Sequence, residues 1–468
     1  MAKRDTSDFR EHLVNVDRKG KRVWLFPKII QGKFYKWRAQ FSWVLLFFLL
    51  SAPWVKYNGH PLFLFNVLER KFIIFGVPFW PQDLYLLAIG LITFIVFIIA
   101  FTAIFGRVFC GWACPQTIFM EMVFRRIETW IEGSPAQQKK LKEQSWNQEK
   151  LIKKGTKNVI FWIISFVISN TFLAYIIGSD ALLHIVTDPL GKHVGGLISI
   201  LIFTTVFYLV FARMRELVCV MICPYGRLQG VLLDSQSIVV AYDFNRGEPR
   251  GKIQKDSVME EKLGDCVDCG LCIDVCPTGI DIRNGTQLEC VHCTACIDAC
   301  DSVMEKINKP LGLIRYSSEA NLKEGKKFKL TTRVAAYAAI WLVLLGVFIA
   351  TVSARKDVQA SLFRAQGSTY SRSENGEVTN IFDMKLVNKT FKNMKIEFRS
   401  LDTNVIIIAG NDLIWVEPGI HRSIPIIVKM QQQFIHENTI PFSIEVTGNG
   451  KPLNIVKDQF MAPVFDHD

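Results

Sequence analysis

Five long apolar stretches interrupt an otherwise mixed sequence. They cover residues 39–55, 84–105, 159–177, 194–211 and 334–352. Each is long enough to cross roughly 30 Å of hydrocarbon as a helix. A buried helix of a large soluble domain is the alternative for each stretch, but residues 84–105 contain no charged side chain at all. The pattern therefore predicts an α-helical transmembrane bundle of about five helices.

The pattern changes beyond the last apolar stretch, over residues 356–468. Apolar side chains alternate with polar ones here, at Phe382, Met384, Leu386, Met394, Ile396, Phe398, Phe442, Ile444 and Val446. Turn signals separate the runs, namely Asn375-Gly376, Pro418-Gly419 and Gly448-Asn449-Gly450. Short alternating strands at this spacing predict an all-β, immunoglobulin-like sandwich. It carries no recognisable catalytic constellation, so a docking or spacer domain is the simpler interpretation.

Lysine and arginine are distributed unevenly around the apolar stretches. Residues 1–38 and the connection between the second and third stretches are rich in both, whereas the alternate connections carry only Lys56, Arg70, Lys71 and Lys192. Because positive loops stay in the cytoplasm, we expect a multi-pass protein of the inner membrane with a cytoplasmic N-terminus and no cleavable signal peptide. Residues 213–333 are then cytoplasmic and residues 356–468 periplasmic.

Composition supports a membrane protein. Half of the residues are apolar, 35 of them phenylalanine, and yet the net charge is +12. A soluble protein rarely combines these properties, whereas a membrane protein with basic inner loops does. We expect the basic segment 1–38 to face anionic lipid, and nucleic-acid binding is not needed to explain it.

Eight cysteines between the fourth and fifth stretches carry the strongest chemical signal. They form two runs of equal spacing, Cys266, Cys269, Cys272 and Cys276, then Cys290, Cys293, Cys296 and Cys300. This is the ligand pattern of a bacterial two-cluster ferredoxin, in which the fourth cysteine of each run serves the other cluster. We therefore predict two [4Fe–4S] clusters, one on Cys266, Cys269, Cys272 and Cys300, the other on Cys276, Cys290, Cys293 and Cys296.

Zinc is the alternative for these cysteines, since paired C-x-x-C units also bind it. Zinc sites do not need a third cysteine at the same step or a proline after the fourth, such as Pro277. Only the second run departs from the pattern, with Asp301 at the position where proline often follows. All twelve cysteines precede residue 301, which fits cytoplasmic clusters and an exported domain without disulfides.

The four remaining cysteines form two matched pairs. Cys110 and Cys114 lie in C-x-x-x-C-P after the second apolar stretch, and Cys219 and Cys223 lie in C-x-x-x-C-P after the fourth. The match indicates a repeated helix hairpin whose cysteine pairs converge. Inert buried thiols are the alternative. A converged site would suit Cu(I), a further cluster or a dithiol/disulfide couple, and Met221 is a candidate thioether ligand.

Two histidines in the second outer connection are weaker candidates. His184 and His193, with Asp188 between them, would suit contact with a quinol or a metal, but a solvated loop is the simpler interpretation. The sequence assigns neither histidine a role.

Together these parts resemble the cytochrome c oxidase accessory family called CcoG, FixG or RdxA. The resemblance covers nearly the whole chain, in order: basic segment 1–38, helices and C-x-x-x-C-P hairpins over 39–212 with the second pair at 219–223, ferredoxin-like insert 213–333, helix 334–352 and sandwich 356–468. It implies assistance in assembling cbb-type cytochrome c oxidase by reduction of Cu(II) to Cu(I). The implied partners are copper, oxidase subunits or copper-delivery proteins, and an unidentified cytoplasmic electron donor.

The resemblance also implies residue roles. The eight ferredoxin-type cysteines would hold the clusters, and Cys110, Cys114, Cys219 and Cys223 would handle copper or relay electrons. Two other functions remain open at this point. One is a quinol-oxidising electron-transfer subunit of a periplasmic reductase system, and the other is a non-redox assembly scaffold with structural clusters.

Overall fold

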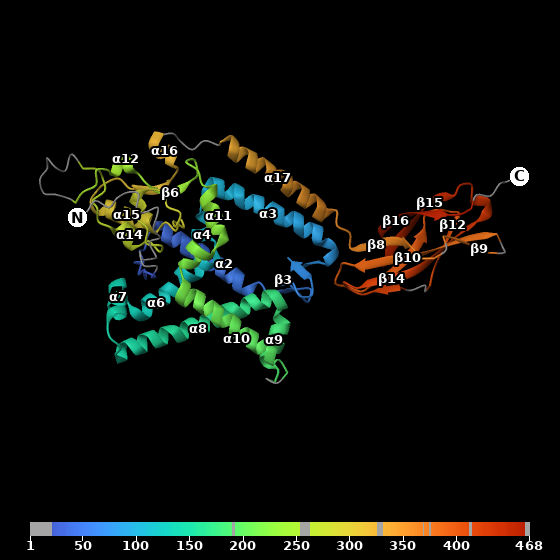
Figure 1. Ribbon diagram of the computed structural model, residues 1–468, viewed down its shortest axis with the longest axis horizontal. Coiled ribbons are helices and arrows are strands. Elements are labelled where there is room, and N and C mark those ends of the chain that lie inside the picture. The colour runs from blue at the N-terminus through green and yellow to red at the C-terminus, as the bar shows by residue number, and fades with distance from the viewer. Residues whose placement is uncertain are drawn as a thin grey trace. The chain divides into compact units, whose positions relative to one another are not determined.

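The computed structural model describes residues 21–189, 192–252, 263–324, 331–367, 369–373, 376–410 and 414–463. The chain divides into two compact units, which Figure 1 shows as the helical part and the part containing the red strands. The first unit comprises Met1–Leu64 and Gly90–Leu345, and the second comprises Phe65–Ile89 and Gly346–Asp468. The basic residues before position 21, which we expect to face anionic lipid, lie outside the described chain.

Four helices in the described part of the chain are long and apolar enough to cross a membrane. They are α3 (Leu84–Phe105), α8 (Gln148–Ile177), α10 (Val194–Leu209, continued by a π-helical turn to Met214) and α17 (Thr332–Ser353). Only 6% of the apolar window of α17 is buried. A helix that is apolar all round yet exposed is explained by lipid, which replaces water at its surface.

The first predicted stretch, residues 39–55, differs from the prediction. Helix α2 (Lys33–Ser51) begins earlier and takes Lys33, Lys36 and Arg38 into its first two turns. In the described chain α2 is therefore not among the four helices that are long and apolar enough to cross a membrane. The polar start of α2 has a physical reason, because its backbone N–H groups at Phe34 and Tyr35 donate to the carboxylate of Asp298 in the cysteine-rich region. At 1.5 Å per residue α2 still measures about 28 Å.

Short helices connect the long ones. They are α4 (Val108–Trp112), α5 (Pro115–Ile118), α6 (Arg125–Glu132), α7 (Pro135–Glu143), α9 (Ser179–Thr187) and α11 (Pro224–Leu232). Their boundaries follow local sequence: Gly133 ends α6 at φ 86°, Ser134 and Gln137 form a capping box at α7, and the side chain of Asn147 caps α8.

The cysteine-rich region contains little regular structure. Helices α14 (Leu271–Asp274) and α15 (Ala295–Lys306) each follow a cysteine loop, and strands β6 (Val239–Tyr242) and β7 (Ile314–Ser317) pair antiparallel at the two ends of the region. Its core mixes apolar side chains such as Ile280 and Ile297 with the cysteines themselves. Three of the eight cysteines, Cys266, Cys272 and Cys293, are buried, four are partly buried, and Cys269 is exposed.

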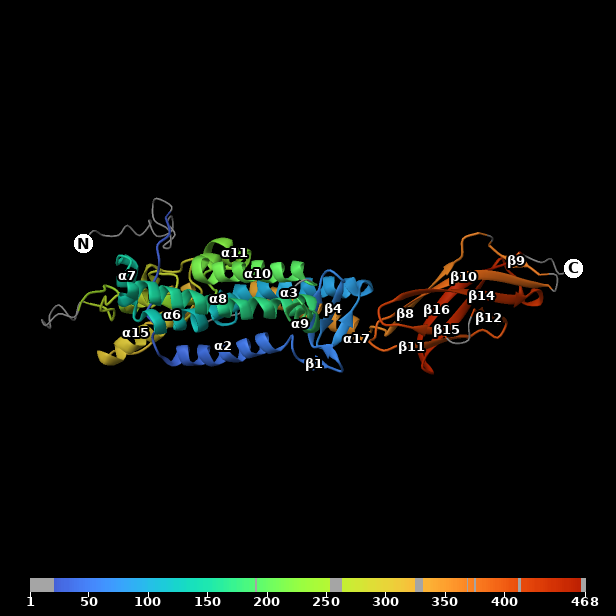
Figure 2. The same cartoon turned by 90° about the horizontal axis from the view of Figure 1, so that it is seen from below.

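The part of the second unit that follows α17 contains two antiparallel sheets. One has the order β12-β14-β10-β8, with β9 beside β10, and the other the order β13-β11-β15-β16. The strands are β8 (Val358–Arg364), β9 (Ser371–Arg372), β10 (Glu377–Asn388), β11 (Met394–Ser400), β12 (Val405–Ala409), β13 (Ile414–Val416), β14 (His421–Gln431), β15 (Thr439–Gly448) and β16 (Lys451–Met461). Figure 2 shows these strands from another side.

The sandwich confirms the predicted alternation. Phe382, Met384 and Leu386 of β10 and Phe442 and Ile444 of β15 are buried in one core between the sheets. The rings of Phe382 and Phe442 meet with centroids 5.4 Å apart. Two sheets with alternating inward-facing residues form the predicted immunoglobulin-like architecture.

A buried carboxylate anchors this sandwich to the segment before α3. Asp83, in a short 3-10 turn (Pro81–Asp83), has a side chain with 0% exposure and accepts from Lys389 Nζ at 2.6 Å and Arg355 at 2.9 Å. Trp80 Nε1 also donates to the backbone oxygen of Lys389. All three charged side chains belong to the second unit. The anchor therefore joins residues close in space that are far apart in sequence.

Replacing Asp83 by asparagine is expected to destabilise the second unit by about 3–5 kcal/mol, because Lys389 and Arg355 would stay buried without a counter-charge. Protease resistance of the purified protein during chemical denaturation measures the change. Asp383→Asn is the matched control, because Asp383 is a half-buried carboxylate on β10. It should change the free energy of unfolding by no more than about 0.5 kcal/mol. Equal effects of both substitutions would contradict the anchor.

Candidate iron–sulfur and thiol sites

The two cysteine runs form loops of the same conformation. Positive φ angles occur two and four positions after the first cysteine in each run, at Asp268 and Gly270 and at His292 and Thr294. Left-handed residues at this spacing turn successive backbone N–H groups toward one side, and such concavities bind anionic groups. The sequence repeat is therefore also a backbone repeat.

Four cysteines surround the first cavity. Cys266, Cys269, Cys272 and Cys300 line it, together with apolar side chains such as Leu313. Three of these cysteines come from the first run and one from the end of the second. This is the set that the crossed ferredoxin pattern predicts for one cluster.

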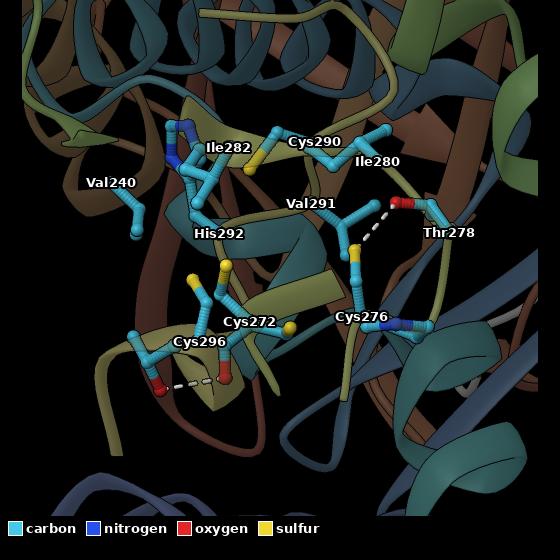
Figure 3. A pocket seen from close by; sticks show the side chains of 13 residues that line it. Val240, Cys272, Cys276, Thr278, Ile280, Ile282, Cys290, Val291, His292 and Cys296 are labelled. Carbon is cyan, nitrogen blue, oxygen red and sulfur yellow. Dashed lines mark hydrogen bonds between the residues drawn. The ribbon is translucent and has the colours of Figure 1, made fainter. Parts of the chain in front are cut away.

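The second cavity, shown in Figure 3, contains the complementary set. Cys276, Cys290, Cys293 and Cys296 line it, with His292 and apolar side chains around them. Cys276 lies on one side of the cavity, where its sulfur meets Thr278 Oγ1 at 3.4 Å. Cys272 borders both cavities. The fourth cysteine of each run thus lies with the first three of the other run, while their ligation stays a prediction.

The chemistry of both cavities suits a cluster. Burial raises the pKa of Cys293 to about 11 and the pKa of Cys290 to about 12, and Cys272 and Cys300 are also raised by burial to about 12. Such thiols keep their protons unless a cationic group replaces them, so iron binding has to release protons. Among the described side chains, no group of three Cys, His, Asp or Glu is arranged to hold a single metal ion.

The paired membrane-side cysteines lie in two copies of one backbone turn. A positive-φ residue, Gly106 or Arg215, stands four positions before Cys110 or Cys219. Cys114 and Cys223 then cap the next helix in extended conformation, at φ −64°, ψ 123° and φ −68°, ψ 111°. A proline follows each as the first helical residue, a position that needs no backbone N–H. The predicted hairpin repeat is therefore present in the backbone.

The two pairs come together. Burial raises the pKa of the Cys110 thiol to about 11, and Cys114 and Cys223 are close enough to contribute to the shift. Burial likewise raises the pKa of Cys219 to about 12, with contributions from Cys114 and Cys110. The four thiols thus form one group, although among the described residues they are not arranged to hold a single metal ion.

This thiol group lies against the second cavity. Cys110 packs with Val291 and Cys293 in one apolar cluster. Gly111 approaches the same segment so closely that an added Cβ would lie 2.4 Å from the carbonyl oxygen of Val291. Cys219 and Val291 line one small cavity together with Thr278. The structure therefore brings together the two cysteine systems that are separate in sequence.

Three polar residues near Cys110 were not singled out from the sequence as site residues. The buried guanidinium of Arg107 donates to Gln229 Oε1 at 3.2 Å, and the thiol of Cys110 donates to the same oxygen at 3.0 Å. The Arg107 backbone N–H donates to His292 Nδ1 at 3.1 Å. Burial and the nearby Arg107 lower the pKa of His292 to about 3, so this imidazole is neutral. In the sequence, the position of Arg107 three residues before Cys110 is the only sign of this network.

A buried ion network supports the second hairpin. Arg215 donates to Glu128 through both terminal nitrogens, the shorter contact being 2.7 Å. Lys157 reaches Glu128 at 3.2 Å and Glu132 at 2.7 Å. Burial alone would raise the pKa of Glu128, but Arg215 and Lys157 hold it at about 2. Because Arg215 begins the turn to Cys219, this network fixes the position of the second cysteine pair.

The histidine candidates form no part of this site. His193 Nε2 lies 3.1 Å from Asp188 Oδ2, and His184 Nδ1 lies 3.9 Å from the other oxygen of that carboxylate. His184 is largely exposed, with a side chain 73% accessible. The interpretation as a solvated connection stays the simpler one.

Comparison with known families matches three parts of the chain. Residues 214–319 match a 4Fe-4S dicluster domain, residues 87–133 match a 4Fe-4S binding domain, and residues 348–463 match the IG-like fold at the C-terminal of FixG. The first match contains all eight ferredoxin-type cysteines, so the chain carries two [4Fe–4S] clusters. The second contains Cys110 and Cys114.

Whole proteins match as well. RdxB and RdxA of Cereibacter sphaeroides are each 34% identical, over 79% and 78% of this chain and 80% and 79% of their own. The nitrogen fixation protein FixG of Rhizobium meliloti is 36% identical over 64% of this chain and 58% of its own. A crystal structure of a FixG-related protein from Vibrio parahaemolyticus covers 24% of this chain at 19% identity, with a TM-score of 0.21. On the whole-chain matches and the three domain matches, this chain belongs to the FixG and RdxA family of membrane-bound iron–sulfur electron-transfer proteins.

Proposed function

We propose that this protein reduces Cu(II) to Cu(I) at its four membrane-side thiols, with electrons from its iron–sulfur clusters, for assembly of a cbb-type cytochrome c oxidase. The observation that supports the proposal is the contact between the thiol group and the second cluster cavity, through Cys110, Val291 and Cys293. The test is the appearance of Cu(I), followed with a Cu(I)-specific chelator, after Cu(II) is added to the anaerobically reduced protein.

The proposed chemistry matches the groups present. Cys266, Cys269, Cys272 and Cys300 would hold one cluster, and Cys276, Cys290, Cys293 and Cys296 the other. The clusters supply one-electron transfer, which is the stoichiometry of Cu(II) reduction. The thiolates of Cys110, Cys114, Cys219 and Cys223 would bind copper and favour the Cu(I) product, because soft ligands stabilise the softer ion.

The copper ion is the substrate, and the chain controls its access. Gln229 and Arg107 fix the orientation of the Cys110 thiol. Tyr225 packs on the same apolar cluster and on the ring of Phe109, 5.9 Å between centroids, which limits water on that side. A metal bound there would displace the thiol protons, so copper binding is expected to release protons.

We place the clusters and thiols at the cytoplasmic face of the inner membrane and the sandwich in the periplasm. The start of α2 and the end of α3 both contact the cysteine-rich region, through Phe34 with Asp298 and through Gly106 with His292. Consecutive helices that meet the same region with opposite ends run in opposite directions. Together with the positive residues of the inner connections, this supports α2 as a fifth membrane crossing.

A reporter enzyme that works only after export tests this topology. Fused after Asp468 it is expected to be active, and inserted at residues 245–251 it is expected to be silent, because the basic connections hold that side in the cytoplasm. A reporter that works only in the cytoplasm, placed at the same two sites, is the control and should give the opposite pattern. Activity of the exported reporter at 245–251 would overturn the orientation.

A further inference from the structure

A large apolar cleft lies beside the thiol group in the first unit. Its volume is about 600 Å³. It is formed by α2, the end of α3 and the segment that carries Cys110. Its lining residues are Trp37, Gln40, Phe41, Val44, Phe101, Val108, Phe109, Trp112 and Ala113. Trp37 and Phe41 are 54% and 45% exposed. The cleft thus lies on the outer surface of α2 and α3.

The lining has the composition of a site for a flat, hydrophobic molecule. Small-molecule sites enclose about 300–1,000 Å³ and combine mostly apolar walls with a few polar groups. Five of the nine lining side chains are aromatic, three are small or aliphatic, and the ninth, Gln40, has an amide that both donates and accepts hydrogen bonds. Aromatic rings favour stacked or edge-on contact with another ring.

One wall of the cleft is formed by the helix that also carries Cys110. Helix α4 (Val108–Trp112) presents Phe109 and Trp112 to the cleft and buries Cys110 in contact with Cys293. An α-helix is about 10 Å across, so one helix diameter separates cleft from thiol. Trp112 Nε1 donates to Tyr316 Oη at 3.2 Å, and Tyr316 donates to the carbonyl oxygen of His292 at 3.3 Å. His292 lines the second cluster cavity.

The opposite wall makes a second connection. The ring of Trp37 lies 6.3 Å from that of Phe34, which lies 6.2 Å from that of Tyr316. Arg38, one residue after Trp37, donates to the carbonyl oxygens of Gly111 at 2.8 Å and Cys293 at 3.3 Å. Both walls therefore contact the second cluster cavity. Such contacts matter for electron transfer, whereas binding of an acyl chain does not require them.

We propose that this cleft binds the ring of a membrane quinol, which is an electron donor of this protein. Oxidation of one quinol would break its two O–H bonds, release two protons to water and supply two electrons, one for each of the two clusters that the eight ferredoxin-type cysteines would hold. Gln40 would hydrogen-bond a ring oxygen, and Trp37 and Trp112 would contact the ring. The destination of the electrons rests on the proposed function, whereas binding of the ring does not.

Photolabelling of the purified, oxidised holoprotein in detergent tests the binding. The probe is an azido-benzoquinone with a decyl chain, and mass spectrometry locates the labelled peptides. We expect label in peptides that contain residues 37–44 and 108–113, displaced by unlabelled decyl-benzoquinone. Val44→Trp, which fills the cleft, should reduce this labelling at least tenfold. Val206→Trp, at another exposed helical valine, is the matched control and should leave it unchanged.

Gln40→Leu provides an independent check, because Gln40 is exposed and its loss should not affect folding. Tenfold weaker quinone binding, with unchanged iron content, supports the proposal. Displacement of the probe by a free fatty acid as effectively as by decyl-benzoquinone would show an acyl-chain groove and overturn it. Labelling that is unchanged in both Val44→Trp and Gln40→Leu would also overturn it. No copper is present, so failure of copper reduction leaves these outcomes unaffected.

Discussion

Replacing Cys110 and Cys223 by serine is expected to abolish reduction of Cu(II) by the purified protein, while about eight iron atoms per chain stay bound. The reason is the convergence of the two membrane-side pairs, since the double substitution removes one thiol from each. A hydroxyl is a poor ligand for Cu(I), so the site loses its preference for the product. Chelator-detected Cu(I) and iron analysis of the same preparation measure both expectations.

Ile222→Leu is the matched control for this double substitution. Ile222 lies between Cys219 and Cys223, is 53% exposed and has no metal-binding atom, so its replacement by an isomeric side chain leaves all four thiols and Met221 in place. Copper reduction should be unchanged in this variant. If the Cys110 and Cys223 double variant reduces Cu(II) and supports oxidase assembly as well as the parent protein, the thiols are packing residues and the proposed function is wrong. Loss of iron in the double variant would instead mean that these cysteines support a cluster.

Cys276→Ser is expected to remove the cluster held by Cys290, Cys293 and Cys296, although Cys276 belongs to the other run. The reason is its position in the second cavity. Anaerobic preparations should lose about four of eight iron atoms, and electron paramagnetic resonance of the reduced protein should keep the signal of one cluster only. The mirror variant, Cys300→Ser, should remove the other cluster, because Cys300 lines the first cavity.

The two variants control for each other. If the fourth cysteine of each run served the cluster of its own run, Cys276→Ser would remove the first cluster and Cys300→Ser the second. The paramagnetic resonance signals left in the two variants would then be exchanged. Comparing each with Cys266→Ser decides this, because Cys266 and Cys300 line the same cavity and should leave the same signal. A residual signal of Cys266→Ser that matches that of Cys276→Ser would contradict the crossed arrangement.

The features visible in the sequence were those with a repeating physical cause. The spacing of Cys266 to Cys276 and of Cys290 to Cys300 gave the two loops, because each run needs the same backbone turns around its cavity. The period of two around Phe382 predicted β10, since alternate residues face one core. The apolar run over 84–105 matched α3, because lipid demands apolar residues on every side.

The remaining features depend on residues that meet only in three dimensions. Trp112, Tyr316 and Phe34 belong to three separate segments, and nothing in their local sequence indicates that they touch. Glu128 and Arg215 are ordinary charged residues until folding buries both. The polar start of α2 was missed because the first turn of this helix donates backbone hydrogen bonds to Asp298 and does not face lipid. Long-range contacts of this kind leave no periodic pattern.

The Asp83 anchor has a consequence for the timing of biosynthesis. Asp83 and Lys389 are 306 positions apart, so at about 5–20 residues per second the ribosome needs roughly 15 to 60 s between them. For most of that interval the Asp83 carboxylate has been made, but neither of its cationic partners, Arg355 and Lys389, has been made. The anchor is complete only when Lys389 has been synthesised, so a chain truncated before it leaves an open segment for a quality-control protease to recognise.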